Sequence, residues 1–232
     1  MPPRLTVIAA AVLVLAASGC GKDDTRVGGT AATSPATAPT GGEKDAAGCL
    51  VVPAPKPRAP GKHSRPTLRL STGRTYTVTL KTNCGDIAIE LDVEQAPKTT
   101  ASFASLVKRG FYDGLSFHRV LADFVVQGGD PLGNGQGGPG YDIVEPPPRT
   151  LRYTRGIVAM AKAQVDPPGS SGSQFFIVTG EDAGLTPDYA LVGKVTSGFE
   201  TLNRIVSEPV SGPEGAPQNP VVIDEATIEP AP

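Results

Sequence analysis

Hydrophobic and polar residues alternate in short runs over the part of the chain that follows residue 74, and turn-forming residues separate the runs. Alternation with a period of two places successive side chains on opposite faces of a β-strand. Runs of about four to eight such residues bounded by Gly, Pro, Asn or Asp are typical of strands. The pattern predicts eight strands, at residues 75–81, 86–91, 115–120, 124–128, 157–161, 174–178, 190–195 and 221–228.

One longer segment between these runs has a helical period instead. In residues 96–110, APKTTASFASLVKRG, Phe103 and Leu106 are spaced so that they lie on one face of a helix. Pro97 suits the first turn, where the missing N–H would have no partner in the helix. Gly110 is placed to end the helix, because glycine readily adopts the left-handed conformation found after a last turn. The segment predicts a helix of about three turns.

A second, shorter helix is predicted at residues 199–206, where Leu202 and Ile205 share one face. Eight strands with two helices favour an antiparallel architecture in which the helices cover the open ends of the sheet. An antiparallel sheet of this size avoids exposed edges by closing on itself. The sequence therefore predicts a mainly β fold, a closed eight-stranded antiparallel β-barrel capped by two α-helices.

The first residues have the composition of a bacterial export signal. Arg4 precedes an apolar run at residues 5–17, and small residues follow it up to Cys20. The run is shorter than the roughly 20 apolar residues that span a bilayer. Ala-Ser-Gly-Cys resembles the lipobox of bacterial lipoproteins, which predicts a signal peptide at residues 1–19 and lipidation of Cys20. The protein would then be extracytoplasmic and anchored to the cell membrane, and the alternative is an ordinary secretory signal with an incidental cysteine.

Residues 20–66 differ in composition from both flanking regions. They are rich in Ala, Thr, Pro and Gly, as in PATAPTGG and PAPKPRAPGK. Such composition is typical of linkers. We expect a tether at residues 20–66 and a single domain at residues 67–232.

If Cys20 carries lipid, Cys49 and Cys84 are the remaining cysteines of the three in the chain. An even remainder in a protein that leaves the reducing cytosol suggests one disulfide. Two unpaired thiols remain the alternative, because a sequence does not show which cysteines lie close together.

Overall composition excludes some classes of function. The chain has 232 residues, of which 39% are hydrophobic, enough for a real core. Lys and Arg number 21 and Asp and Glu 23, which gives a formal net charge of -2. This balance does not favour nucleic acid as a partner. The glycine cluster at residues 133–140 lacks the Gly-Lys-Ser/Thr ending of a phosphate-binding loop, so we expect a loop beside a groove.

Four sequence motifs occur together in the predicted barrel: FHRV at 117–120, FVVQGGDP at 124–131, GSQFFI at 172–177 and LVGKV at 191–195. In this order and spacing they resemble the cyclophilins, which are peptidyl-prolyl cis-trans isomerases, and the resemblance extends over residues 75–229. It implies proline-containing polypeptides as substrates, a monomer, and neither a cofactor nor a metal. Rotation about a prolyl bond breaks no covalent bond, and its barrier of about 18–20 kcal/mol comes from amide resonance.

Arg119 is a charged residue in a strand that is predicted to build the core. Charged side chains seldom occupy such strands unless they have a functional role or a hydrogen-bond partner. Counting by two places Phe117 and Leu121 on its face, and Val125 and Gln127 on one face of the next strand. A cation that donates a hydrogen bond to the prolyl nitrogen withdraws its lone pair from resonance, and arginine does so without titrating. The alternative is an arginine that is only solvated or salt-bridged.

The resemblance implies a role for individual residues. Arg119, Phe124 and Gln127 would be catalytic. Ala161 and Lys162 correspond to an Ala-Asn pair that binds substrate backbone in the family. The expected substrate-binding residues are Val125, Gly135, Ala161, Lys162, Gln174, Phe176, Leu185 and Tyr189.

Two positions depart from the family pattern. Gly184 stands where many members have Trp or Phe, and Tyr189 stands where many have His. Cyclosporin, the cyclic peptide inhibitor of the family, draws on that tryptophan in sensitive members. We therefore expect weak cyclosporin binding. His118 has no accompanying nucleophile motif and is interpreted as a structural histidine.

The leading hypothesis is thus a membrane-anchored prolyl isomerase that assists the folding of exported or envelope proteins. A noncatalytic peptide-binding or holding module on the same fold is the main alternative. A surface adhesin that uses the barrel only as a scaffold is a further one. Retention of Arg119, Gln127 and Phe176 argues for the enzyme.

Overall fold

The computed structural model describes residues 42–59 and 62–230. The predicted signal peptide at residues 1–19 and the predicted lipidation site Cys20 lie outside the described residues. No helix in the described ranges has the length and apolar character needed to cross a bilayer.

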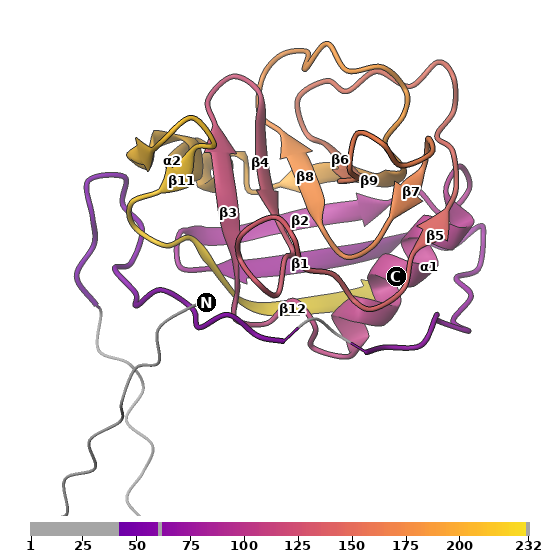
Figure 1. Ribbon diagram of the computed structural model, residues 1–232, viewed down its shortest axis with the longest axis horizontal. Helices are drawn as coiled ribbons and strands as arrows, with labels where there is room; N and C mark the ends of the chain where they lie inside the picture. Colours follow the sequence, from indigo (N-terminus) through magenta and orange to yellow (C-terminus); the bar gives the residue numbers. More distant parts are fainter. Residues whose placement is uncertain (1–41, 60–61, 231–232) are drawn as a thin grey trace, which may run out of the picture. The chain divides into compact units, whose positions relative to one another are not determined.

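Eight strands close into an antiparallel barrel in the order β1-β12-β3-β4-β8-β6-β9-β2, as the sequence predicted (Figure 1). Two helices, α1 and α2, pack against the barrel at different sides. Each predicted strand is present within two residues of its expected ends. The barrel strands are β1 (Tyr76–Thr82), β2 (Gly85–Leu91), β3 (Leu115–Leu121), β4 (Val125–Gly128), β6 (Ile157–Met160), β8 (Phe175–Val178), β9 (Leu191–Ser197) and β12 (Val222–Pro230).

Helix α1 (Pro97–Lys108) begins and ends as its sequence predicts. Pro97 occupies the first turn, and Gly110 follows the last turn with a left-handed φ of 64°. The N-terminus is capped from a distant loop, because the Glu145 carboxylate accepts hydrogen bonds from the backbone N–H groups of Lys98 and Thr99. A carboxylate at this end also complements the helix dipole. Helix α2 (Phe199–Ser207) buries Leu202 and Ile205 on one face.

The barrel interior is filled by apolar side chains and a cluster of aromatic rings. Phe103 from α1 and Phe117 from β3 each meet Phe175 of β8 edge to face, with ring centroids 5.4 and 5.8 Å apart. Tyr112 joins the cluster and donates its hydroxyl to the Ser173 carbonyl. Edge-to-face contacts add to the free energy gained by burying the rings.

Four short strands were not predicted from the sequence. They form two separate two-stranded sheets, one of β10 (Val210–Ser211) with β11 (Ala216–Pro217) and one of β5 (Ile143–Val144) with β7 (Ser170–Ser171). Each strand has two residues, too few for an alternating pattern to exist. The contacts of the surrounding loops, and not the local sequence, produce these pairings.

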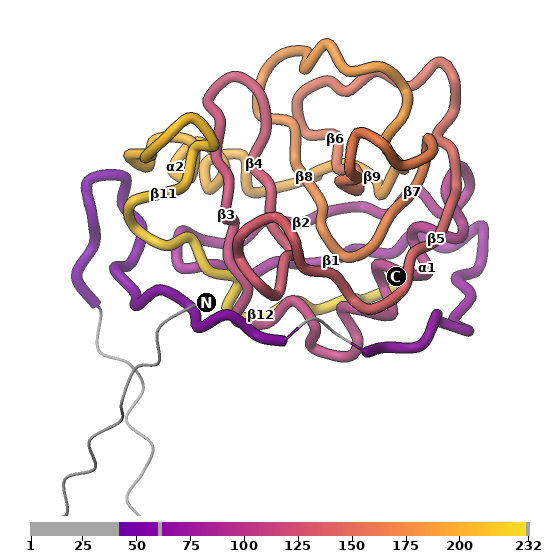
Figure 2. Tube along the Cα trace, in the orientation of Figure 1, coloured from indigo at the N-terminus to yellow at the C-terminus, as the bar shows by residue number. Residues whose placement is uncertain are grey.

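The expected boundary between tether and domain at residue 66 differs from the structure. Described residues from 42 onward belong to the same compact unit as the barrel. Residues 42–59 and 62–70 are here called the strap, which begins beside α2 and β11, runs below β12 and continues past α1 in the view of Figure 2. Leu68 and Leu70 pack against the main core. Proline-rich composition predicted a free linker, but these residues make specific contacts along their length.

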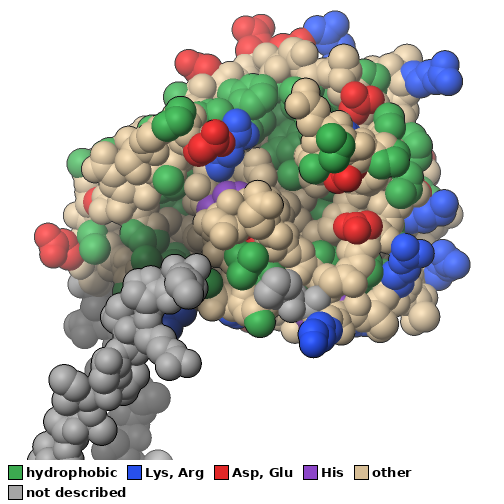
Figure 3. All heavy atoms as spheres, in the orientation of Figure 1, with side chains coloured by type: hydrophobic (Ala, Val, Ile, Leu, Met, Phe, Trp, Pro, Cys, Tyr) green, Lys and Arg blue, Asp and Glu red, His purple; other side chains and the backbone are tan. Residues whose placement is uncertain are grey.

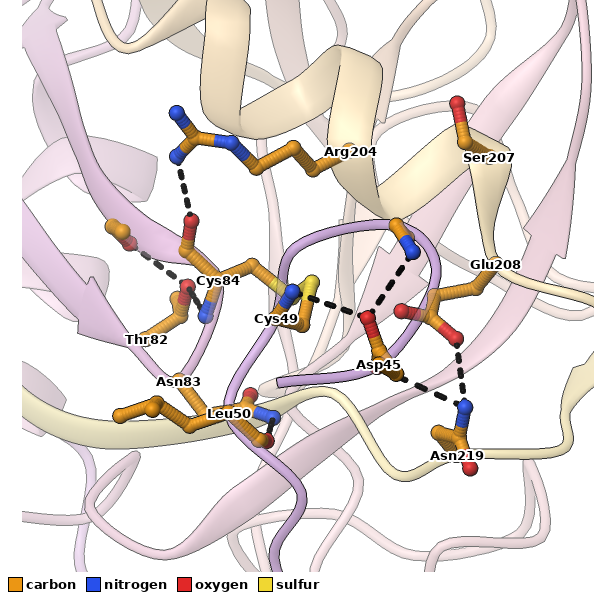
Figure 4. The surroundings of a disulfide bond; sticks show 12 residues. Asp45, Cys49, Leu50, Thr82, Asn83, Cys84, Arg204, Ser207, Glu208 and Asn219 are labelled. Atoms are coloured by element: carbon orange, nitrogen blue, oxygen red, sulfur yellow. Dashed lines mark hydrogen bonds between the residues drawn. A yellow bond between two sulfur atoms is a disulfide. The ribbon is translucent and has the colours of Figure 1, made fainter. Parts of the chain in front are cut away.

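A disulfide between Cys49 and Cys84 joins the strap to the turn between β1 and β2 (Figure 4). Both cysteines are buried, at 1% and 3% exposure. Beside them, Leu50 donates its backbone N–H to the Asn83 carbonyl at 2.8 Å, and the Asn83 side chain donates to the Leu50 carbonyl at 2.7 Å. The start of the strap is therefore held by one covalent bond and a pair of reciprocal hydrogen bonds.

Two carboxyl groups meet beside the disulfide. Glu208 is buried after α2, and the Asn219 amide donates to its Oε2 at 3.2 Å and to Asp45 Oδ2 at 3.5 Å (Figure 4). Burial and a hydrogen bond to Asp45 raise the pKa of Glu208 from 4.5 to about 7. Folded Glu208 thus binds a proton that the unfolded chain releases between these pH values, and its contribution to stability is lost as the pH rises through this window.

We therefore expect the melting temperature of the wild-type protein to fall between about pH 5 and 8 more steeply than that of Glu208→Gln. Glutamine keeps a donor for Asp45 and cannot ionise. Thermal unfolding followed by circular dichroism at several pH values measures the difference. Glu94→Gln, at an exposed position, is the control and should behave like wild type. Parallel pH profiles for wild type and Glu208→Gln would contradict the assignment.

Candidate active site

A cavity of about 260 Å³ opens on the outer face of β4 and β8. Hydrophobic side chains gather in the hollow of this face, and a basic and an acidic side chain lie together at its rim (Figure 3). All three residues expected to be catalytic and six of the eight expected to bind substrate line it. The lining residues are Arg119, Phe124, Val125, Gln127, Ala161, Lys162, Phe176, Leu185 and Tyr189.

The register of three neighbouring strands places the central side chains in one row. Arg119 of β3 pairs with Gln127 of β4, and Gln127 pairs with Phe176 of β8. Residues directly opposite in an antiparallel sheet lie close enough for their side chains to interact. A basic, an amide and an aromatic side chain thus follow one another across the sheet.

Arg119 reaches this face through an irregularity that the sequence did not reveal. Counting by two predicted that Phe117 and Arg119 share a face, and this is wrong. The β3–β4 register shifts between them, so Phe117 points into the barrel core while Arg119 lines the cavity. A β-bulge of this kind re-aims a side chain. His118 lies within the bulge, where an extra residue breaks the alternation.

The floor of the cavity belongs to a second hydrophobic cluster, separate from the barrel interior. Val125, Phe176 and Tyr153 are buried in it, and Phe124 and Leu185 pack against it. This cluster covers the outer face of β4, β8 and β6. Apolar side chains outside the barrel that are not covered by a helix form a surface that an apolar ligand can occupy.

Tyr189 is held in place by Tyr153, which sequence reasoning missed. The Tyr153 hydroxyl donates to the Tyr189 carbonyl at 2.6 Å and accepts the Tyr189 N–H at 3.0 Å. Burial raises the pKa of Tyr153 to about 12. The Tyr189 ring then meets Phe176 edge to face at 5.4 Å. Tyr153 lies between two predicted strands in a stretch without periodic pattern, so the sequence offered no signal for its role.

A chain of hydrogen bonds leads from Arg119 to the glycine-rich loop. Arg119 Nη1 donates to Gln127 Oε1 at 3.5 Å, a long contact, and Gln127 Nε2 donates to Gln174 Oε1 at 3.0 Å. Gln174 Nε2 in turn donates to the carbonyls of Gly135 and Gly137, at 3.0 and 2.9 Å. Gln174 and Gly135 line a neighbouring cavity of about 400 Å³, which also shares Gln127 with the first.

The Arg119 guanidinium has few firm partners. Its Nε lies 3.8 Å from Glu214 Oε2, and no hydrogen bond to Nε is present among the described residues. The Glu214 side chain is 86% exposed, so water screens this ion pair. Among the described residues, the long contact to Gln127 is the one hydrogen bond that the guanidinium of Arg119 makes.

The model of the family described as "Cyclophilin type peptidyl-prolyl cis-trans isomerase/CLD" matches residues 77–228. The chain belongs to the cyclophilin family. It is 43% identical to peptidyl-prolyl cis-trans isomerase cypE of Dictyostelium discoideum over 133 aligned residues. The aligned region covers 56% of this chain and 83% of that protein. It is 38% identical over 169 residues to peptidyl-prolyl cis-trans isomerase B of Streptomyces anulatus, covering 65% and 95%.

Solved structures agree with this assignment. A crystal structure of a Cryptosporidium parvum cyclophilin-type isomerase, determined in the presence of the dipeptide Ala-Pro, is 36% identical with a TM-score of 0.62. It covers 66% of this chain and 98% of that one. The comparisons show that this cyclophilin is a peptidyl-prolyl cis-trans isomerase.

Of the positions that depart from the family pattern, Lys162 and Tyr189 line the cavity of this cyclophilin and Gly184 does not. Lys162 Nζ donates to the Asp166 carbonyl at 3.1 Å and lies 5.5 Å from the centre of the Tyr189 ring. Gly184 is outside the residues that line the cavity, and a Cβ atom built on it meets no atom within 4 Å. Tyr189 supplies an aromatic side chain to the cavity wall, and Gly184, next to the lining residue Leu185, supplies none.

His118 is the histidine next to Arg119, and its environment keeps it neutral. Burial, the larger cause, and the positive charge of Arg119 lower the pKa of His118 from 6.5, while Asp130 opposes the shift. Its Nδ1 has no hydrogen-bond partner among the described residues. The neutral imidazole then places no charge beside Arg119 at neutral pH.

We accordingly expect kcat/KM for a proline peptide to be flat between about pH 6 and 9. No bond to hydrogen is broken in the reaction, a guanidinium stays protonated over this range, and burial lowers the pKa of His118 from 6.5. A protease-coupled assay at constant ionic strength measures the profile. A bell-shaped curve centred near pH 7 in folded protein would make His118 an acid or a base.

Proposed function

We propose that the cavity around Arg119 and Phe176 catalyses prolyl rotation in polypeptides outside the cytoplasm. The observation that supports this most strongly is a guanidinium with only long polar contacts that lines an apolar cavity. The apolar cavity can bind the ring of a prolyl residue, and the guanidinium can donate a hydrogen bond to its nitrogen. The Ala-Pro dipeptide present with the related Cryptosporidium enzyme is consistent with a substrate that contains proline.

The first contribution to catalysis is apolar. Phe124, Phe176 and Leu185 receive the proline ring. A planar amide is stabilised by charge separation between oxygen and nitrogen, whereas the twisted amide in the transition state is less polar. An apolar surface that excludes water therefore favours the twisted form relative to the planar one.

The second contribution is a hydrogen bond that forms only as the amide twists. As conjugation is lost, the prolyl nitrogen becomes pyramidal and its lone pair can accept a donor. Arg119 supplies that donor, and Gln127 and Gln174 hold the substrate backbone from the same side. An interaction made in the transition state and not in the ground state raises kcat. No nucleophile, acid or base takes part.

Arg119→Ala should lower kcat/KM by at least about tenfold, or about 1.4 kcal/mol, since it removes this donor. Arg119→Lys should also be impaired, because an ammonium group lacks the planar fork of donors. The melting temperature should change little, since the side chain is partly exposed and its ion pair is weak.

Arg69→Ala, at an exposed strap position away from the cavity, is the matched control and should keep wild-type activity. Full activity in Arg119→Ala would refute the role of the guanidinium. A wild-type protein that binds proline peptides without isomerising them would instead be a holding module.

The place of action is proposed from the N-terminus and the disulfide. Residues 1–19 have the pattern of an export signal ending at a lipobox-like Cys20. The Cys49–Cys84 disulfide suits an oxidising compartment. Together they support a lipid-anchored isomerase that acts on exported or envelope proteins close to the membrane.

Growth of a bacterial expression host with labelled palmitate should mark the wild-type protein, and Cys20→Ser should carry no label and leave the membrane fraction. Palmitate labelling and fractionation of the same cultures give both readouts. The Cys20→Ser protein should keep its isomerase activity, because Cys20 precedes the described residues of the compact unit. An unlabelled, soluble wild type would favour plain secretion and leave the catalytic proposal unaffected.

A further inference from the structure

The strap touches the active-site region at two points. The backbone N–H of Arg58 donates to the Pro131 carbonyl at 2.8 Å, and the backbone N–H of His63 donates to the Pro139 carbonyl at 2.9 Å. Pro131 and Pro139 are the two ends of the glycine-rich loop beside the cavity, here called the glycine wall (residues 131–139). The strap therefore fastens both ends of this loop from outside.

Phe111 forms the surface on which the strap rests between these two points. Arg58 Nη2 donates to the Phe111 carbonyl at 2.5 Å, and its guanidinium carbon lies 5.9 Å from the centre of the Phe111 ring. The His63 imidazole meets the same ring edge to face at 5.5 Å. Both strap residues are thus fixed by their side chains as well as by their backbone.

From inside, the glycine wall is folded around one buried carboxylate. Asp130 is 1% exposed and accepts hydrogen bonds from the backbone N–H groups of Leu132, Asn134 and Gly135, at 2.8, 2.9 and 2.5 Å. Gly137 packs so closely on Asp130 that a Cβ atom there would collide with its Oδ1. The wall has no strand pairing of its own, so Asp130 and the strap are its main fixed points among the described residues.

The wall in turn holds the side chains that reach into the cavity. Its carbonyls at Gly135 and Gly137 are the acceptors for Gln174 Nε2, and Gln174 orients Gln127, which contacts Arg119. A continuous series of contacts therefore runs from the strap through the glycine wall, Gln174 and Gln127 to the Arg119 guanidinium. A displacement of the wall would remove both acceptors of Gln174 and leave its amide free to rotate.

We propose that Arg58 and His63 are positioning residues for prolyl isomerisation, which hold the glycine wall and, through Gln174 and Gln127, set the orientation of Arg119. This inference rests on the proposed role of Arg119. No described residue of the strap lines the proline pocket, so the strap acts through the wall and not through substrate. It extends the functional unit of the enzyme beyond the family domain matched at residues 77–228.

The test variant removes the two backbone N–H groups that bind the glycine wall, and the matched control leaves both of them in place. In Arg58→Pro/His63→Pro, the N–H groups that bind Pro131 and Pro139 are lost. Lys56→Pro/Ser64→Pro adds two prolines to the same segment and removes one basic side chain, Lys56, to match the loss of Arg58 in the test variant. The N–H groups of Lys56 and Ser64 have no hydrogen bond within the described ranges.

The first readout is a double-mutant cycle with Gln174→Ala, measured as kcat/KM. We expect the test variant to lose about threefold or more relative to its control in the wild-type background, and to lose almost nothing in the Gln174→Ala background. Coupling of this kind requires that the strap act through Gln174. An equal loss in both backgrounds, which a merely structural role would produce, overturns the proposal, and so does the absence of any loss.

The second readout does not depend on catalysis. Amide hydrogen exchange at Asn134 and Gly135, whose N–H groups bind Asp130, should be roughly tenfold faster in the test variant than in its control. Exchange in β1 and β12 should be unchanged, which shows that the barrel is folded. Unchanged exchange at Asn134 and Gly135 refutes the proposal even if the wild type proved inactive, whereas inactivity alone would refute only the proposed function. If the double variant does not fold, Arg58→Pro and His63→Pro are each measured alone with the same criteria.

Discussion

The location of the cavity depends on the register between β3, β4 and β8. Arg119, Gln127 and Phe176 lie opposite one another on three adjacent strands, and this row exists only in the observed pairing. Because side chains alternate between faces, a slip of one residue between β4 and β8 would turn Phe176 into the barrel. Closure of the barrel prevents such a slip, since every strand is bonded on both sides and the apolar interior fits one register.

Much of the barrel could be predicted from the sequence because its strands and α1 follow simple periods. Resemblance to cyclophilins, and not periodicity, identified loop residues such as Leu185 and Tyr189, whose position depends on chain segments far away in sequence. The bulge at His118 could not be predicted, since it is defined by the partner strand and has no pattern of its own. Tyr153 was missed for a similar reason. Its hydroxyl exchanges two hydrogen bonds with the backbone of Tyr189, a residue far away in the sequence.

The strap shows why proline-rich composition is a weak guide to order. The strap is bonded to the glycine wall by the backbone N–H groups of Arg58 and His63. Almost any residue has such a group, so no pattern of side chains in the sequence predicts these bonds. Prolines also restrict the unfolded chain, which lowers the entropy lost when a segment is ordered. The Cys49–Cys84 disulfide adds to this by keeping the strap near the barrel. A segment with the composition of a linker can therefore be ordered along the surface of a domain.

The presence of Arg119 at this position is better explained by a role in catalysis than by a contribution to the stability of the fold. A half-buried guanidinium loses hydration, and this cost is recovered only when its donors find good acceptors. Here the contacts to Gln127 at 3.5 Å and to Glu214 at 3.8 Å are long, and the second partner is almost fully exposed. Neither contact uses the full donor capacity of the group. Arg119 also lines an apolar cavity, and a twisted prolyl nitrogen bound there is the kind of acceptor that would use this capacity.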